Sequence, residues 1–341
     1  MRRAGHGVGL VILAVILGGL PFVVTKYQVD ILITLLVNVI LVVSFRLITT
    51  TGRWSLAHIP MMGAGAYATA LMTGTLGIPF WVSLPLSGLV AALVALVMSY
   101  PLARTKGFAF FIASFAAGEA LRLCWTRFKI PFGGHKGLTD ISIPVLVPDV
   151  PALDFSKAIP YYFLALAVTI ACLALMYRLD RSRIGDTWKA IESHDDLARS
   201  LGINITRYNM LAFVIGSAFA GIAGVMQAHR LWAVVPAQYG FVTTLYLLVW
   251  VVFGGTHTFF GAVIGVVILT ILRELLMPLF EWVPMIFGTI IILTLIFLPS
   301  GLEGLPKRLS WLRKMKVQIS FGEVPEVQPE RVKQGAASPA E

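Results

Sequence analysis

Long apolar runs separated by short polar stretches dominate the pattern of this chain. A membrane-spanning helix needs about 20 mostly apolar residues, because each residue advances about 1.5 Å through a hydrocarbon core about 30 Å thick. By this measure the sequence predicts an all-α, polytopic integral membrane protein with about ten transmembrane helices. The predicted spans cover approximately residues 8–24, 31–49, 56–73, 81–100, 108–126, 159–177, 209–228, 242–255, 261–278 and 284–299.

Composition and charge agree with a membrane protein. Hydrophobic residues make up 57% of the 341 positions and charged residues 13%, whereas soluble domains carry about 45–50% and about 25%. With both termini in the cytoplasm, about 19 of the 27 Lys and Arg residues fall on the cytoplasmic side. This is the usual positive-inside asymmetry. It predicts a multi-pass membrane protein, surrounded by lipid, whose net charge of +10 sets orientation and does not bind nucleic acid.

The predicted transmembrane domain covers residues 1–305 and includes two long polar segments. Residues 127–158 form an outer loop, and residues 178–208 form a charged cytoplasmic loop. Residues 306–341 are basic at first and then polar and proline-containing, so they are predicted to be a disordered cytoplasmic tail.

The cytoplasmic loop contains a predicted amphipathic helix from Ser182 to Leu201, with Gly202 as its C-terminal cap. One apolar stripe on this helix consists of Ile184, Trp188, Ile191, Ala198 and Leu201. The stripe has two interpretations. It packs against the ends of the chain's own spans, or it inserts into a groove of a cytosolic partner.

Small residues and charges also recur within the predicted spans. Gly63 and Gly65, then Gly216 to Gly224 at four-residue spacing, and Gly261 with Gly265 allow helix backbones to approach closely. Such faces serve internal packing or contact a second membrane subunit. Glu119 and Arg122 lie one helical turn apart and are predicted to neutralise each other, with a contact to substrate as the alternative. Arg273 and Glu274 form a second predicted pair, and His58 is predicted to bond at a helix end rather than relay protons.

Several chemistries are missing from the sequence. It contains no G-x-x-x-x-G-K-[ST] phosphate loop, no H-E-x-x-H helix and no G-x-S-x-G turn. Its six histidines are dispersed, and Cys124 and Cys172 lie in separate apolar runs. The sequence therefore predicts no catalytic residue, no metal site and no cofactor, and it disfavours a membrane-embedded enzyme.

Three segments, in the same order along the chain, match short sequence patterns of one protein family. Gly52 to His58, continuing to Gly63-Ala64-Gly65-Ala66-Tyr67, is similar to that family's S-L-[GA]-[HQ]…G-x-G-A-Y element. Gly118 to Leu123, followed by Gly133-Gly134 and Gly137-Leu138, resembles its G-E-x-x-R-L…G-G-x-x-G-[LI] pattern. Residues 190–208 resemble its cytoplasmic loop, and Ala220 to Gly224 extend the match, which covers about residues 30–305.

Together these segments resemble the permeases of branched-chain amino-acid ABC importers. The resemblance is greatest to the M-type of the two permease subunits and implies the ABC importer permease architecture. It implies a second homologous permease, two ATPase subunits that bind the ATP, and a periplasmic substrate-binding protein. It also implies that residues 178–208 contain a coupling helix, with Trp188 and Ile191 as anchors and Gly202 at its end. Candidate pathway or structural residues are Ser55, His58, Gly63, Gly65, Glu119, Arg122, Gly133 and Gly134.

Departures from the family pattern leave the solute open. Phe132 precedes the double glycine where Thr is common, His135 and Lys136 follow it, Pro60 and Met61 follow His58, and His257 replaces a usual Gly. The resemblance therefore implies a branched-chain amino acid or another small polar or carboxylate solute, such as urea, an amide or an aromatic acid. His135 and Lys136 either favour a carboxylate or an acidic rim of the binding protein, or are solvated loop residues. An ion-coupled secondary transporter is the alternative function, for which Glu119 and His58 would supply the ionisable groups.

Overall fold

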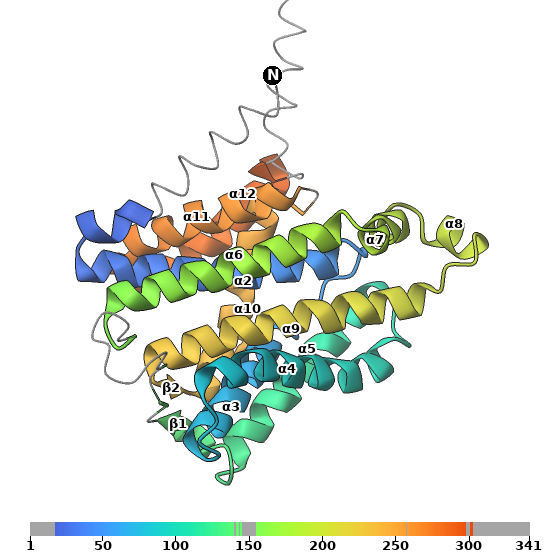
Figure 1. Ribbon diagram of the computed structural model, residues 1–341. Helices are drawn as coiled ribbons and strands as arrows, with labels where there is room; N and C mark the ends of the chain where they lie inside the picture. The colour runs from blue at the N-terminus through green and yellow to red at the C-terminus, as the bar shows by residue number, and fades with distance from the viewer. Residues whose placement is uncertain are drawn as a thin grey trace, which may run out of the picture. The chain divides into compact units, whose positions relative to one another are not determined.

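The computed structural model describes residues 18–139, 141–142, 144, 155–256, 258–297 and 301–302. These residues belong to a compact unit that ends at Glu303 and is almost entirely helical (Figure 1). Its elements are α2 (Lys26–Thr49), α3 (His58–Gly74), α4 (Phe80–Leu102), α5 (Gly107–Arg127), η1 (Gly134–Lys136), β1 (Leu138–Thr139), α6 (Ala158–Asp180), α7 (Arg183–Ser193), α8 (Asp195–Ser200), α9 (Ile205–Leu231), β2 (Ala233–Val234), η3 (Pro236–Tyr239), α10 (Phe241–Gly254), α11 (Phe259–Leu275), η4 (Met277–Trp282) and α12 (Val283–Phe297).

Side-chain caps define where several helices begin. Thr25 and Gln28 form a reciprocal capping box at the start of α2. The Asn204 side chain accepts a hydrogen bond from the Arg207 backbone at 3.1 Å at the start of α9. Thr258 does the same for Gly261 at 3.1 Å at the start of α11. Each cap satisfies a backbone N–H that the first helical turn leaves without a partner.

The all-α polytopic class predicted from the sequence is confirmed, but the count of ten spans is not. Among the described residues, five helices are long and apolar enough to cross a membrane, namely α2, α4, α5, α6 and α9. Helix α3 has 17 residues and α10 has 14, because Gly254 and Gly255 end α10 early. Most of the predicted first span and the predicted tail of residues 306–341 lie outside the described residues.

Helix α9 packs against α2, α3 and α4 and lies at the centre of these contacts. Glycines make the approach possible. A Cβ atom added to Gly65 on α3 would overlap the backbone of Gly221 on α9, and one added to Gly224 would overlap that of Met62. A Cβ on Gly216 would lie 2.8 Å from Ile48 of α2. The predicted small-residue faces therefore serve internal packing, which confirms that interpretation for these glycines.

Three long helices, α4, α5 and α6, have apolar faces that are exposed. Only 17% of the spanning window of α5 is buried inside the chain, against 78% of that of α2. Exposed side chains on α4 and α5 include Leu93, Val97, Phe108 and Ile112. Lipid or another membrane protein must cover such surfaces, because water solvates them poorly.

The helix ends are joined differently on the two sides of the unit. At one end, β1 and β2 form a short antiparallel pair in which Leu138 is opposite Val234. At the other end, α7 and α8 connect α6 to α9 (Figure 1). We refer to these as the β end and the α7 end.

Candidate functional site

The predicted single helix from Ser182 to Leu201 is two helices. Ser182 caps α7, and His194 ends it with an extended backbone at φ −151° and ψ 95°. Asp195 and Asp196 then occupy the first turn of α8, where negative side chains favour a new helix N-terminus. The prediction of one helix is therefore wrong at His194. Gly202 follows α8 with a φ of +81°, as its predicted capping role requires.

The apolar stripe on this segment faces the chain itself. Trp188 is 1% exposed, and its indole nitrogen donates a hydrogen bond to the Tyr208 carbonyl oxygen at 3.0 Å. Ile191 and Ala198 are buried in a small cluster with Ile205, and Ile184 is half-buried. In this conformation Trp188 and Ile191 are not accessible as anchors for a partner, which corrects that interpretation. Of the two interpretations of the stripe, packing against the chain's own helices therefore applies to Trp188 and Ile191.

Two leucines supply the exposed apolar surface of the segment. Leu201, the last member of the predicted stripe, is 74% exposed, and Leu197 is 60% exposed. The acidic residues Asp195 and Asp196 are exposed close by on α8. Sequence analysis missed Leu197 because it lies off the stripe, although an exposed leucine in a charged helix is a detectable signal.

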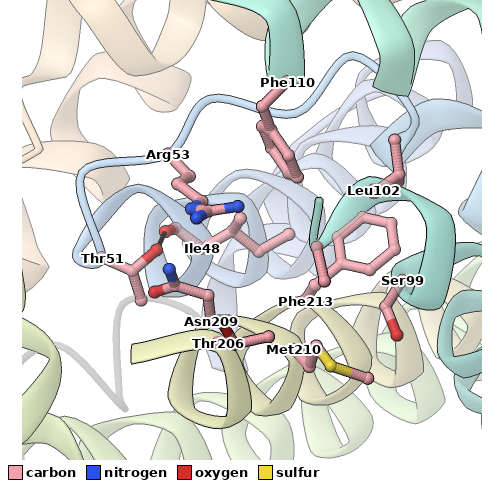
Figure 2. Close-up of a pocket in the computed structure, with 11 residues that line it drawn as sticks. Ile48, Thr51, Arg53, Ser99, Leu102, Phe110, Thr206, Asn209, Met210 and Phe213 are labelled. Atoms are coloured by element: carbon pink, nitrogen blue, oxygen red, sulfur yellow. Dashed lines mark hydrogen bonds between the residues drawn. The ribbon is translucent and has the colours of Figure 1, made fainter. Parts of the chain in front are cut away.

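Arg53 lies in the connection between α2 and α3 and contacts two other segments at the α7 end. Its guanidinium donates to the Thr105 carbonyl oxygen at 3.2 Å and lies 5.0 Å from the centre of the Phe110 ring. The side-chain amide of Asn209 faces it and, with its oxygen toward the guanidinium, accepts from Arg53 Nε at 2.8 Å. Figure 2 shows Arg53, Phe110 and Asn209 around a small pocket formed by α2, α4, α5 and α9.

The junction of α7 and α8 contacts this same connection. A Cβ atom added to Gly52 would lie 3.7 Å from the Cα atom of Glu192. Burial lowers the pKa of Arg53, and the negative charge of Asp195 on α8 opposes that effect. The α7–α8 segment is therefore linked to the α2–α3 connection both by packing and by charge.

Sequence analysis did not identify the ionic network at the α7 end. Arg46 on α2 is 1% exposed and binds Asp180 at the end of α6, with 3.1 Å between Arg46 Nη1 and Asp180 Oδ1. Lys189 on α7 lies 3.5 Å from the other oxygen of the same carboxylate. The available signal was Arg46 itself, a charge within an apolar run.

Two candidate residues, His58 and Ser55, lie at and just before the start of α3, and His58 contacts α2. His58 is fully buried, with its Nε2 atom 2.9 Å from Ser44 Oγ and 3.2 Å from the Leu41 carbonyl oxygen. The buried Ser55 accepts a hydrogen bond from the Ala57 backbone at 3.3 Å. The predicted helix-end role of His58 is confirmed.

Near the β end, Gly63 faces an aromatic cluster made of Tyr67, Trp125, Phe132 and Tyr239. Tyr67 stacks on Trp125 with 4.7 Å between ring centres. A Cβ atom on Gly63 would lie 2.7 Å from the Trp125 ring. The cluster joins α3, α5 and η3 and adjoins the predicted Gly133-Gly134 turn through Phe132.

Gly133 and Gly134 form a turn that only glycine adopts readily, with φ angles of +77° and +63°. A surface hollow beside this turn is lined by the basic side chains of Arg127, Lys129, His135 and Lys136. The structure thus brings Gly63, Gly133 and Gly134 into one region and leaves Ser55 and His58 in another.

The predicted ion pair on α5 is confirmed. Arg122 Nε lies 2.7 Å from Glu119 Oε2, and both side chains are about one quarter exposed or less. The second predicted pair has different partners. Glu274 accepts a hydrogen bond from the Tyr27 hydroxyl at 3.0 Å, and Arg273 lies 5.5 Å from the Tyr246 ring centre.

Within the part of the chain that the structure describes, no group of three His, Cys, Asp or Glu side chains could hold a metal ion. The helices, the lipid-facing surfaces and the polar network at one end define a multi-pass membrane protein. The ion pair of Arg46 and Asp180 joins α2 to α6, whereas the pair of Glu119 and Arg122 lies within α5.

Comparison with known proteins identifies the family. Residues 27–299 match the model of the branched-chain amino acid transport system permease component, and the chain belongs to this family. It is 30% identical over 317 residues to the high-affinity branched-chain amino acid transport system permease protein LivM of Salmonella typhimurium, which covers 86% of the chain and 74% of that protein. The chain is 29% identical to LivM of Escherichia coli over 317 residues, which again make up 86% of the chain and 74% of that protein.

A second group of relatives matches a shorter part of the chain. The high-affinity branched-chain amino acid transport system permease protein LivH of Escherichia coli is 33% identical over 140 residues, 40% of the chain and 45% of that protein. No solved structure matches the chain. The family match shows that the chain is a transport permease component, which confirms the predicted resemblance.

Proposed function

We propose that this chain is the membrane-spanning permease subunit of an ABC importer that carries branched-chain amino acids or a related small polar or carboxylate solute. Family membership and the names of its relatives support the solute class. The alternative of an ion-coupled secondary transporter has no comparable support.

The energy would come from other chains. The sequence lacks a phosphate-binding loop, so we propose that two separate ATPase subunits bind and hydrolyse ATP and that this chain has no cofactor of its own. A second homologous permease would complete the pathway, and a periplasmic binding protein would deliver the solute. The chain would lie in the bacterial inner membrane, with both termini and the α7 end in the cytoplasm.

The exposed surface of α8 is the observation that carries the proposed binding of an ATPase subunit. Leu197 and Leu201 project from a charged segment at one end of the helices, beside Asp195 and Asp196. Apolar side chains ringed by charges are typical of a protein contact. We propose that this surface is where an ATPase subunit binds residues 178–208.

The aromatic cluster and the Gly133-Gly134 turn would lie toward the periplasm in this orientation. The basic side chains beside the turn, including His135 and Lys136, then favour contact with an acidic rim of the binding protein. Glu119 and Arg122 remain candidate pathway residues, although their mutual pairing favours a structural role.

A co-purification experiment tests the α8 surface. Leu201→Asp is compared with Leu76→Asp, because Leu76 is equally accessible at 70% exposure but lies between α3 and α4. We expect Leu201→Asp to reduce recovery of the ATPase subunits about tenfold or more, since one interface anchor contributes about 2 kcal/mol. Leu76→Asp is expected to retain them. Equal recovery with both variants would contradict the proposal.

A further inference from the structure

Asp180 is shared by basic groups from two different helices. Its Oδ1 atom binds Arg46 of α2 at 3.1 Å, and its Oδ2 atom lies 3.5 Å from the Lys189 Nζ atom of α7. Lys189 also donates a hydrogen bond to the Asp180 backbone carbonyl oxygen at 2.8 Å. One residue at the end of α6 therefore connects α7 to α2.

Arg46 extends this connection to a further helix. Its Nε atom donates to the carbonyl oxygen of Thr256 at 2.9 Å, in the short stretch between α10 and α11. Its guanidinium carbon lies 5.8 Å from the ring centre of Phe259, the first residue of α11. A chain of polar contacts thus runs from α7 through α6 and α2 to the start of α11.

The two sides of the shared carboxylate differ in their surroundings. The Arg46 side chain is 1% exposed and the Asp180 side chain 11%, whereas the Lys189 side chain is 41% exposed. Water competes with the contact made by Lys189 but hardly with that made by Arg46. Displacement of α7 can therefore break the Lys189 contact while the buried pair persists.

Packing attaches two parts of α7 to different helices. A Cβ atom on Gly185 would overlap the carbonyl oxygens at the end of α6, and Trp188 is bonded to Tyr208 of α9. Movement of α7 together with the end of α9 can therefore separate Lys189 from Asp180, which belongs to α6.

We propose that Lys189 and Asp180 are positioning residues that transmit movement of the α7–α8 segment to α2 and α11. With α7 in place, Asp180 is held between two cations. When α7 is displaced, the carboxylate is bound by Arg46 alone, and the contacts of Arg46 with Thr256 and Phe259 adjust. This gives the helix ends two arrangements, which coupling between distant sites requires. The inference rests on the proposed function, because it needs an ATPase subunit to move the segment.

The test uses the complete transporter in proteoliposomes and measures ATP hydrolysis and solute import in the same vesicles. Lys189→Gln removes the cation from a half-exposed position, so folding is retained, and Lys189→Arg keeps a cation within reach of Asp180. Asp186→Asn is the matched control, since it removes only the longer 3.9 Å contact between Asp186 and Lys189. Asp180→Asn removes the charge partner of both Lys189 and Arg46.

We expect Lys189→Gln to raise the ATP hydrolysed per solute imported about fivefold or more, with the ATPase subunits still bound. Lys189→Arg and Asp186→Asn are expected to keep the wild-type ratio, and Asp180→Asn to raise it. A wild-type ratio in Lys189→Gln would overturn the inference, as would loss of the ATPase subunits from that variant. Failure of the proposed function itself is distinguishable, because the wild-type chain would then import without ATP or without ATPase subunits.

Discussion

The indole nitrogen of Trp188 on α7 donates a hydrogen bond to the carbonyl oxygen of Tyr208 on α9, at 3.0 Å. The donor and acceptor belong to helices on either side of α8, so this bond closes the α7–α8 segment onto the end of α9. The segment is thereby part of the packed structure, while Leu197 and Leu201 stay exposed.

Truncation of Trp188 is expected to destabilise the chain. Trp188→Ala removes a large buried ring and should lower the free energy of unfolding by about 3–5 kcal/mol. Trp188→Phe keeps most of the packing and loses mainly the hydrogen bond, at a cost of about 1 kcal/mol. Thermal unfolding in detergent measures both. Unfolding of Trp188→Ala at the wild-type temperature would show that the ring is not part of the core.

The contact between α3 and α9 depends on the absence of side chains. Gly65→Ala places a Cβ atom against the Gly221 backbone and should destabilise the chain by about 1–3 kcal/mol. Gly74→Ala is the matched control, because nothing lies within 4 Å of its added Cβ atom. It should leave stability unchanged or raise it slightly. Equal unfolding temperatures for the two variants would mean that α3 and α9 are farther apart than described.

The pair formed by Glu119 and Arg122 can be separated into structural and pathway roles. Glu119→Gln leaves Arg122 without its partner and should cost about 1 kcal/mol, since both side chains are partly exposed. Exchange of the two residues, Glu119→Arg with Arg122→Glu, restores the pair and should restore stability and import. If the exchanged variant is stable but does not import, one of these groups contacts the solute.

The buried pair of Arg46 and Asp180 should respond unequally to single and double substitutions. Asp180→Leu leaves a buried guanidinium without its carboxylate and should cost about 3–5 kcal/mol. Arg46→Met combined with Asp180→Leu removes both charges and should cost less than the single change. Unfolding free energies of the wild type, the single variants Asp180→Leu and Arg46→Met, and the double variant form the test. Additive losses would show that the two side chains do not interact.

The sequence was sufficient for features that depend on local spacing. Runs of apolar residues located the long helices, the three-residue spacing of Glu119 and Arg122 placed them in contact, and Gly216 to Gly224 predicted close packing of one helix face. The helical class follows from such patterns, because each arises within one helix. The family follows from three short motifs that occur in order along the chain.

Tertiary relationships were not accessible in the same way. Arg46 and Asp180 are separated by 134 positions, and nothing local indicates that they share a site. The burial of Trp188 depends on where α9 lies, so the apolar stripe alone could not distinguish internal packing from a partner contact. The break at His194 is a backbone feature within an otherwise helical pattern.

The central claim is that the chain conducts solute while other subunits supply the energy. The most direct measurement is uptake of labelled leucine into proteoliposomes that contain the chain alone or the chain with a second permease, ATPase subunits and binding protein. We predict accumulation against a gradient only in the complete system and only with ATP on the side of the ATPase subunits. Accumulation by the chain alone, driven by an ion gradient without ATPase subunits, would contradict the account.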